Sequence, residues 1–467
     1  MSILETSKIV IPKELKKVYE IFHNAGFSVY LVGGAVRDEL LGKKNHDWDL
    51  ATDASPQQVM KLFRRVVPTG IAHGTVTILM NGFSLETTTF RTESGYSDGR
   101  HPDKVCYTSS LEEDLSRRDF TMNAIAADLG TGIISDPFDG RSDIRNKIIR
   151  TVRNPLERFT EDGLRPVRAV RFASQLGFKI AEDTFSALSD PEVLKKTKGV
   201  SLERFRDELC KILSCEKPSV GLKLLEQTGM LDIFIPEFKS ARGCLQNDGR
   251  GFHEFDVLDH LFYACDGAPK DNLIVRLAAL FHDIGKPVCR TEEKTSDGTL
   301  IHFYRHETES EKLCRKIMMR LKFSNAQINS VCLLVKEHMF YYESSWSDAA
   351  VRRFIVRAGS DSIDDLILVR LADVYGMHCV PMQETSPSWK LLCEFKERIK
   401  KILSEKQALG LKDLAVSGKD LMAEGLPSGK ILGLILNELL ETVLDSPQMN
   451  EKDKLLNLAL NLYKNRA

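Results

Sequence analysis

The hydrophobic pattern of this chain changes character near residue 150, and that change limits the folds open to it. Before this point strand-like and helix-like segments alternate, whereas beyond it apolar residues recur at helical spacing. Residues 29–32 and 48–52 are predicted to be strands, and residues 36–41 and 56–63 are predicted to be helical. The pattern therefore predicts an α+β fold, in which a mixed sheet with helices precedes an all-helical remainder.

Two more strands are expected in the first part, at residues 75–80 and 84–90. Asn81-Gly82 lies between them and is a strong signal for a tight hairpin turn. A chain of 467 residues is too long for one ordinary core. Residues 240–251 contain three glycines among polar residues, a composition typical of a linker. We therefore expect four domains, at residues 1–150, 151–239, 240–380 and 381–467.

Composition places the chain among globular proteins. Hydrophobic residues make up 42% and charged residues 28%, and no apolar stretch is long enough to span a bilayer. The N-terminal segment lacks the layout of a secretory signal, so a cytoplasmic location is expected. Ten cysteines without a C-x-x-C pair predict reduced thiols rather than disulfides or a cysteine zinc site. No feature implies a membrane or a protein partner.

Basic residues are concentrated in one segment although the net charge is only −1. Between Arg141 and Arg171 nine basic residues stand against four acidic ones. Clustered Lys and Arg are the electrostatic footprint of RNA or triphosphate binding. This segment is therefore a candidate contact for such a ligand.

A glycine pair and an aspartate pair form the first chemical motif. Gly33 and Gly34 follow a predicted strand and enter a helix, where backbone amides can approach a triphosphate closely. Asp47 and Asp49 come shortly after, on the next predicted strand, and alternate strand residues point to the same face. Two converging carboxylates can hold Mg²⁺ for nucleotidyl transfer. An isolated D-x-D is more often a solvated strand end, but the nearby glycines favour the functional interpretation.

The run from Leu31 to Thr52, LVGGAVRDELLGKKNHDWDLAT, resembles the signature of class II tRNA nucleotidyltransferases and the related bacterial poly(A) polymerases. The resemblance implies that Asp47 and Asp49 are the catalytic, Mg²⁺-binding carboxylates. It also implies that Gly33, Gly34 and Arg37 help to seat the nucleotide. Glu86, on a later strand, is a candidate third acid.

Further segments follow in the same order as in that family. Residues 117–123 (RRDFTMN) resemble its ribose-recognising motif, and residues 161–165 (EDGLR) its base-selecting motif. Asp162 and Arg165 are three apart, so one helical face would present both to the Watson–Crick edge of a base. Each motif taken alone also fits a bland alternative, a helix cap for the first and a surface ion pair for the second. The resulting set of predicted nucleotide-binding residues is Gly33, Gly34, Arg37, Arg118, Asp119, Asn123, Asp162, Arg165, Arg168 and Arg171.

Two local features bear on these motifs, a proline beside the base-selecting segment and a polar loop before the ribose-recognising one. Pro166 directly follows Arg165, so we expect the helix to begin at or after Glu161, or to bend there. Residues 91–103 are polar and contain glycine, a loop composition, and resemble the flexible loop of the family. In that family the loop accompanies the addition of A, which argues against an enzyme that adds only CC.

Histidines and aspartates form a second constellation in the later helical part. An H-D dipeptide is common by chance, but here it belongs to an ordered series of metal-ligand types. The series is His260, His282-Asp283, His306, His338 and Asp373. It resembles the HD-superfamily phosphohydrolases in the version with two extra histidines. By this resemblance His260, His282, Asp283 and Asp373 bind one divalent transition metal of unknown identity, His306 and His338 complete a second site, and Lys286 contacts substrate phosphate.

These motifs favour an enzyme that adds CCA to the 3′ end of tRNA from CTP and ATP, with a separate phosphohydrolase site. An A-adding enzyme or a poly(A) polymerase shares the same first motifs and remains an alternative. A phosphohydrolase whose first domain only binds nucleotide or RNA is an alternative of another class, and a non-catalytic RNA-binding protein is a third. The last residues, 381–467, match only loosely a helical tail that binds tRNA.

Overall fold

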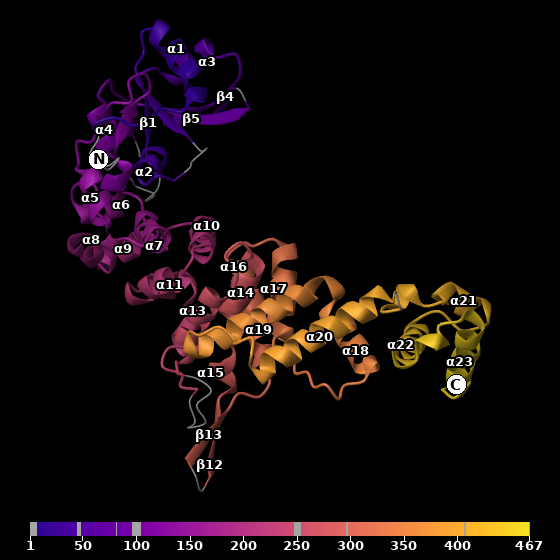
Figure 1. Ribbon diagram of the computed structural model, residues 1–467. Coiled ribbons are helices and arrows are strands. Elements are labelled where there is room, and N and C mark those ends of the chain that lie inside the picture. Colours follow the sequence, from indigo (N-terminus) through magenta and orange to yellow (C-terminus); the bar gives the residue numbers. More distant parts are fainter. Residues whose placement is uncertain are drawn as a thin grey trace. The chain divides into compact units, whose positions relative to one another are not determined.

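The computed structural model describes residues 7–43, 48–80, 82–95, 104–246, 254–295, 298–405 and 408–466. The chain divides into two compact units, Met1–Pro236 and Glu237–Ala467. The first contains a mixed sheet followed by helices, and the second is almost entirely helical (Figure 1). The α+β fold expected from the patterning is therefore confirmed.

The sheet of the first unit has seven strands in the order β3-β4-β5-β2-β1-β8-β9. Only β2 and β5 pair in parallel; all other neighbours are antiparallel. The central strands are almost wholly buried, because helices cover the sheet. The strands are β1 (Val29–Val32), β2 (Asp49–Thr52), β3 (Val66–Gly70), β4 (Thr75–Met80), β5 (Phe83–Thr89), β8 (Ala126–Asp128) and β9 (Ile134–Ser135).

Local sequence signals account for much of this sheet. Met80 pairs with Phe83 at the end of the β4–β5 hairpin, which leaves a two-residue connection. Gly82 has φ of +82°, a conformation that glycine adopts without strain, while Asn81 lies outside the described residues. Helix α3 (Pro56–Leu62) begins with a capping box between Ser55 and Gln58. The strands and helices expected before residue 90 are thus confirmed to within two residues at each described end.

The segment expected to be a flexible loop is partly a strand. Residues 91–94 form β6 (Arg91–Ser94), which pairs with β7 (Lys104–Tyr107) in an antiparallel ribbon. Cross-strand hydrogen bonds outweigh the polar, loop-like composition of this stretch. Residues 96–103, the remainder of the predicted loop, lie outside the described residues.

Short helices connect the sheet to the end of the first unit. Helix α7 packs against α10 and α11, and the rings of Phe205 and Phe234 stack with centroids 3.8 Å apart. The other helices of this unit are α1 (Lys16–Asn24), α2 (Gly34–Leu40), α4 (Leu111–Ser116), α5 (Gly140–Asn146), α6 (Pro155–Glu161), α7 (Arg165–Leu176), α8 (Glu182–Leu188), α9 (Pro191–Lys198), α10 (Leu202–Leu213), α11 (Pro218–Gln227) and α12 (Met230–Phe234). Strands β10 (Ile148–Ile149) and β11 (Lys179–Ile180) pair in parallel.

The second unit starts with a helical bundle around a buried cluster of histidines. Its helices are α13 (Val257–Gly267), α14 (Leu273–Phe281), α15 (Lys286–Cys289), α16 (His306–Arg320), α17 (Asn325–Glu337), α18 (Asp348–Ala358) and α19 (Ile363–His378). The expectation of helix alone was wrong here, because β12 (Thr291–Thr295) and β13 (Gly298–His302) form a hairpin. Thr295 pairs with Gly298, which leaves a two-residue connection between the strands.

The end of the chain has a small core of its own. Leu421, Leu439 and Leu455 are fully buried there and belong to one hydrophobic cluster. The helices are α20 (Pro387–Ser404), α21 (Gly418–Ala423), α22 (Lys430–Asp445) and α23 (Lys452–Lys464), as expected for a helical end. Among the described residues, no helix combines the length and apolar character needed to cross a membrane.

Candidate active site and metal centre

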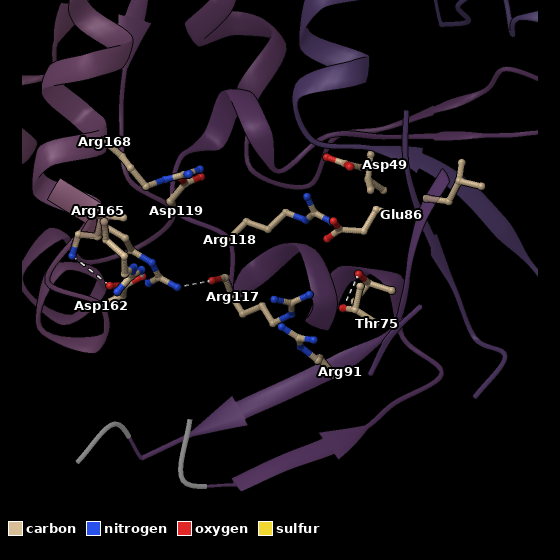
Figure 2. Close-up of a pocket in the computed structure, with 15 residues that line it drawn as sticks. Asp49, Thr75, Glu86, Arg91, Arg117, Arg118, Asp119, Asp162, Arg165 and Arg168 are labelled. Atoms are coloured by element: carbon tan, nitrogen blue, oxygen red, sulfur yellow. Dashed lines mark hydrogen bonds and ion pairs between the residues drawn. The ribbon is translucent and has the colours of Figure 1, made fainter. Parts of the chain in front are cut away.

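A polar cavity of about 330 Å³ lies in the first unit (Figure 2). Its lining combines acidic side chains with several arginines, a combination suited to a metal–triphosphate ligand. The charged lining residues are Asp49, Glu86, Arg91, Arg117, Arg118, Asp119, Asp162, Arg165, Arg168 and Arg204.

The acidic part of this cavity comes from two neighbouring strands. Asp49 on β2 stands directly beside Glu86 on β5 in the parallel register. Figure 2 shows both carboxyl groups close to the guanidinium of Arg118. Asp47 lies outside the described residues, so its convergence with Asp49 stays a prediction. Sheet pairing accounts for the position of Glu86, which sequence spacing alone only suggested.

Gly33 creates the space in which Arg118 lies. A Cβ atom at Gly33 would be 2.9 Å from Nη1 of Arg118 and 3.8 Å from Oδ2 of Asp49. The residue also has φ of +68°, which disfavours any side chain. Gly34 begins α2 without such a conformation, and a Cβ there would meet Arg37 at 3.4 Å. Of the two glycines, only Gly33 has a backbone conformation that disfavours a side chain, and a Cβ there would displace the end of Arg118.

Arg37 and Asn123 lie behind the cavity and do not line it. Arg37 donates from Nη1 to Oδ1 of Asn123 at 2.8 Å, and Asn123 donates from Nδ2 to Oδ1 of Asp119 at 3.1 Å. The other carboxylate oxygen of Asp119 lies 2.7 Å from Nη2 of Arg168. Burial alone would raise the pKa of Asp119, but the charge of Arg168 and these hydrogen bonds lower it to about 2. The network keeps Asp119 ionised at the cavity wall.

Arg171 lies outside the cavity as well. Its Nε is 2.6 Å from Oε2 of Glu208, and both side chains are buried. The guanidinium lies over the ring of Phe172, 3.8 Å from the centroid. These contacts tie α7 to α10.

Asp162 and Arg165 do not share a helical face, so that expectation was wrong. Helix α6 ends at Glu161, Asp162 is extended with φ of −131°, and α7 begins at Arg165. Gly163 approaches the backbone of Lys196 so closely that an added Cβ would be 2.5 Å from its carbonyl oxygen. This contact, together with Pro166 in the first turn of α7, breaks the helix. The expectation that a helix starts after Glu161 is confirmed.

Both side chains nevertheless line the cavity. Arg165 donates from Nη1 to Oε2 of Glu161 at 2.6 Å and from Nη2 to the carbonyl of Arg117 at 2.9 Å. Asp162 accepts at 2.8 Å from Nη2 of Arg204. Arg204 was not anticipated, because it lies on α10 and only tertiary packing brings it to this site.

The histidines and aspartates of the second unit form two adjoining groups that could each hold a metal ion. In the first group, Nε2 of His260 lies 3.1 Å from Nε2 of His282 and 3.3 Å from Oδ1 of Asp373. In the second group, Nε2 of His306 lies 3.3 Å from Nε2 of His338. These five residues and Asp283 are all at least 95% buried. Helices α13, α16 and α19 and the residues directly after α14 and α17 supply them.

Asp283 belongs to both groups. Its Oδ2 is 3.3 Å from Nε2 of both His260 and His282, while its Oδ1 is 3.0 Å from Nε2 of His306. One carboxylate therefore reaches both groups, the usual role of a residue that bridges two metal ions.

Backbone contacts orient three of the imidazoles. The Nδ1 atoms of His282, His306 and His338 lie 2.9, 2.8 and 2.6 Å from main-chain carbonyl oxygens. Each Nδ1 must donate there, which leaves Nε2 as the lone-pair atom turned into the cluster. Burial alone would lower the pKa of His282, but the carboxylates of Asp283 and Asp373 outweigh it and raise the pKa to about 10, so a metal ion would have to displace a proton from its Nε2. The buried carboxylates among these imidazoles fit a divalent cation.

A cavity of about 390 Å³ opens onto this cluster. Lys286 lines it, with Nζ 2.5 Å from Oδ2 of Asp283 and 2.7 Å from Oε1 of Gln246. Arg370 also lines it and donates to Oδ2 of Asp373 at 2.9 Å. Two cations thus lie beside the metal-ligand carboxylates, where a phosphate group could bind.

Models of known protein families match both units of the chain. Residues 29–150 match the model of the poly A polymerase head domain, and residues 177–242 match the probable RNA and SrmB-binding site of polymerase A. Residues 250–377 match the HD domain model.

Relatives that match over almost their whole length include CCA-adding enzymes. The chain is 35% identical to the CCA-adding enzyme of Levilactobacillus brevis, over 96% of this chain and 98% of that one. It is also 35% identical to that of Enterococcus faecalis, over 96% of each chain. Among solved structures, the Bacillus stearothermophilus CCA-adding enzyme in complex with CTP matches with TM-score 0.72 and 28% identity, covering 98% of this chain and 99% of that one. The Thermotoga maritima CCA-adding enzyme complexed with tRNA has TM-score 0.53 at 20% identity over 98% and 97%, a likeness of fold alone.

Proposed function

The chain belongs to the family of CCA-adding enzymes, and we propose that it completes the 3′ end of tRNA with CTP and ATP, releasing pyrophosphate. The observation that carries this proposal is the cavity in which Asp49 and Glu86 face several arginines. Carboxylates on neighbouring strands suit a metal-bound triphosphate, and the surrounding guanidinium groups suit its oxygens.

Three residues of the cavity act on the metal ion, the triphosphate and the sugar in this proposal. Asp49, together with Asp47, would hold Mg²⁺, which activates the 3′-hydroxyl of the tRNA and offsets charge on the transferring phosphoryl group. Arg118 lies beside Asp49 and binds triphosphate oxygens. Asp119 stays ionised beside Arg168 and accepts from the sugar hydroxyls, with Asn123 and Arg37 supporting it from behind.

Base selection is assigned to the break between α6 and α7. Asp162 offers carboxylate acceptors and Arg165 offers guanidinium donors, which together can match the Watson–Crick edge of C or A. Arg204 holds Asp162 from α10, so it is a positioning residue for this step.

One assay separates this proposal from an A-adding enzyme, a poly(A) polymerase and a head that only binds. The protein is incubated with labelled CTP or ATP and tRNA transcripts that end before CCA, after C, and after CC. We expect completion of all three, and loss of incorporation in Asp49→Ala. Addition only to the CC-ended transcript would indicate an A-adding enzyme, and long A tails on unrelated RNA a poly(A) polymerase. Absence of incorporation would indicate that the first unit only binds nucleotide or RNA.

We propose that the second unit is a metal-dependent phosphohydrolase. His260, His282, Asp283 and Asp373 would hold one divalent ion, and His306 and His338 would share Asp283 to hold another. Metal ions at these positions would supply a hydroxide nucleophile at neutral pH. Lys286 and Arg370 orient the phosphate of the substrate.

The test uses chelated protein reloaded with single divalent metals and a cyclic phosphodiester or phosphomonoester substrate. Hydrolysis should require metal and should be lost in His282→Ala, whereas CCA addition should continue. A rate of hydrolysis that His282→Ala leaves unchanged would assign the activity to another site.

We also propose a role for each of four parts of the chain. We assign residues 1–150 to nucleotidyl transfer, 151–239 to base selection and RNA binding, 240–380 to phosphohydrolysis, and 381–467 to tRNA binding. A tRNA substrate and ten cysteines that form no disulfide both favour action in the cytoplasm.

A further inference from the structure

The hairpin of the second unit brings an exposed aromatic ring to the cavity above the histidine cluster. Strands β12 and β13 pair over their full described length, and His302 at the end of β13 is followed by Phe303 and Tyr304. His302, Phe303 and Tyr304 all line the cavity. Tyr304 is 73% exposed and also lines the cavity, so its ring is open to a ligand that enters there.

Neighbouring side chains hold this ring in place. His302 stacks on Tyr304 with ring centroids 5.1 Å apart and planes 14° from parallel. Glu293, on the adjacent strand β12, lies 3.1 Å from Nε2 of His302 and fixes that imidazole in turn. One face of Tyr304 is therefore occupied by His302, while most of its surface stays open to solvent. A ring held in this way loses little conformational freedom when a ligand stacks on it.

The buried part of the same cavity is lined by charged rather than aromatic side chains. Lys286 is 7% exposed and Asp283 is 2% exposed, and both lie among the metal ligands. The cavity thus combines a charged interior, in which Lys286 and Arg370 lie beside the carboxylates of Asp283 and Asp373, with an aromatic surface near solvent. A phosphate ester that also carries a planar base matches both parts, because nucleobases stack on aromatic side chains and phosphates bind cations.

We propose that Tyr304, positioned by His302 and Glu293, is a specificity-determining residue that stacks on the base of a nucleoside monophosphate bound in this cavity. The inference rests on the proposed phosphohydrolase function of the second unit. In the hydrolytic step the ester P–O bond breaks, water gives its hydroxyl to phosphorus, and its proton goes to the ribose oxygen that leaves. A sugar phosphate without a base would undergo the same step but would lack the contact with Tyr304.

Steady-state hydrolysis tests this role with a matched pair of substrates, adenosine 5′-monophosphate and ribose 5-phosphate. Tyr304→Ala should raise KM for adenosine 5′-monophosphate about tenfold, as expected for loss of one base–aromatic stack, with kcat nearly unchanged. Tyr304→Phe should restore KM, and ribose 5-phosphate should respond to neither variant. Tyr341 is also exposed, at 68%, but does not line the cavity, so Tyr341→Ala is the control.

A binding measurement keeps this inference separate from the hydrolytic activity. In protein labelled with 3-fluorotyrosine, the ¹⁹F resonance that is missing from Tyr304→Phe belongs to Tyr304. Adenosine 5′-monophosphate should shift this resonance and ribose 5-phosphate should not, whether or not hydrolysis occurs. If adenosine 5′-monophosphate shifts the Tyr304 resonance but is not hydrolysed, the phosphohydrolase proposal would be wrong and the stacking role would stand. An unmoved Tyr304 resonance, or equal KM changes for both substrates, would overturn the stacking role.

Discussion

At the scale of single residues, the lack of a side chain at Gly33 leaves room for Arg118 beside Asp49. Gly33→Ala would force a methyl group against Arg118 in a backbone conformation with φ of +68°. We expect the rate of nucleotide incorporation to fall about 100-fold, because small displacements of positioning groups have effects of that size.

Gly26→Ala is the matched control for this change. Gly26 has φ of +79°, but no atom lies within 4 Å of an added Cβ. It carries the same backbone strain without the clash, so incorporation should stay near the level of the unmodified protein. Equal losses in the two variants, measured as kcat/KM for CTP, would show that strain rather than the position of Arg118 matters.

Arg171 offers a second test at this scale, because its partner is a buried carboxylate. Arg171→Met would leave the buried Glu208 without its closest cation, although Lys211 still lies 3.0 Å from its Oε1, and should destabilise the first unit by about 2 kcal/mol. Adding Glu208→Leu should recover most of this loss, since it removes the buried charge. Urea unfolding followed by circular dichroism measures both changes. A raised KM for CTP without loss of stability would instead indicate direct contact with the nucleotide.

At the scale of elements, the break between α6 and α7 illustrates how far local patterns reach. Pro166 correctly predicted a helix start, because proline fits only a first turn. The break itself depends on Gly163 packing against Lys196, a contact that residue spacing cannot predict. The β4–β5 hairpin was predictable from its turn residues, whereas the β12–β13 hairpin was missed; Gly298 there is a strand residue that pairs with Thr295.

The start of α7 can be tested directly with two substitutions. Pro166→Ala should change the free energy of unfolding by less than about 1 kcal/mol, since no helical hydrogen bond depends on that position. Ala169→Pro, one turn further on, should cost at least about 3 kcal/mol and abolish incorporation by distorting the helix that carries Arg165 and Arg168. Thermal denaturation and the incorporation assay together distinguish these outcomes. Similar melting temperatures for the two variants would contradict a helix start at Arg165.

At the scale of the whole molecule, the two units should respond separately to metal. A divalent ion at 100 times its dissociation constant stabilises the unit that binds it by about 2.7 kcal/mol. Chelation should therefore lower the melting temperature of one unfolding transition. His282→Ala should lower the melting temperature of the same transition, and Asp49→Ala should leave it unchanged. Differential scanning calorimetry before and after chelation measures this. A chelation effect that persists in His282→Ala would place the stabilising ion elsewhere.

The sequence by itself determined the order of the elements, the change from sheet to helix, and the residue types suited to each chemistry. These properties follow from short-range periodicity and from side-chain chemistry, which any stretch of chain carries with it. Only the tertiary structure decided that Glu86 stands beside Asp49, that Arg204 holds Asp162, and that Asp283 reaches both histidine groups. Such contacts join residues distant along the chain, and strand pairing and helix packing, rather than spacing, bring them together.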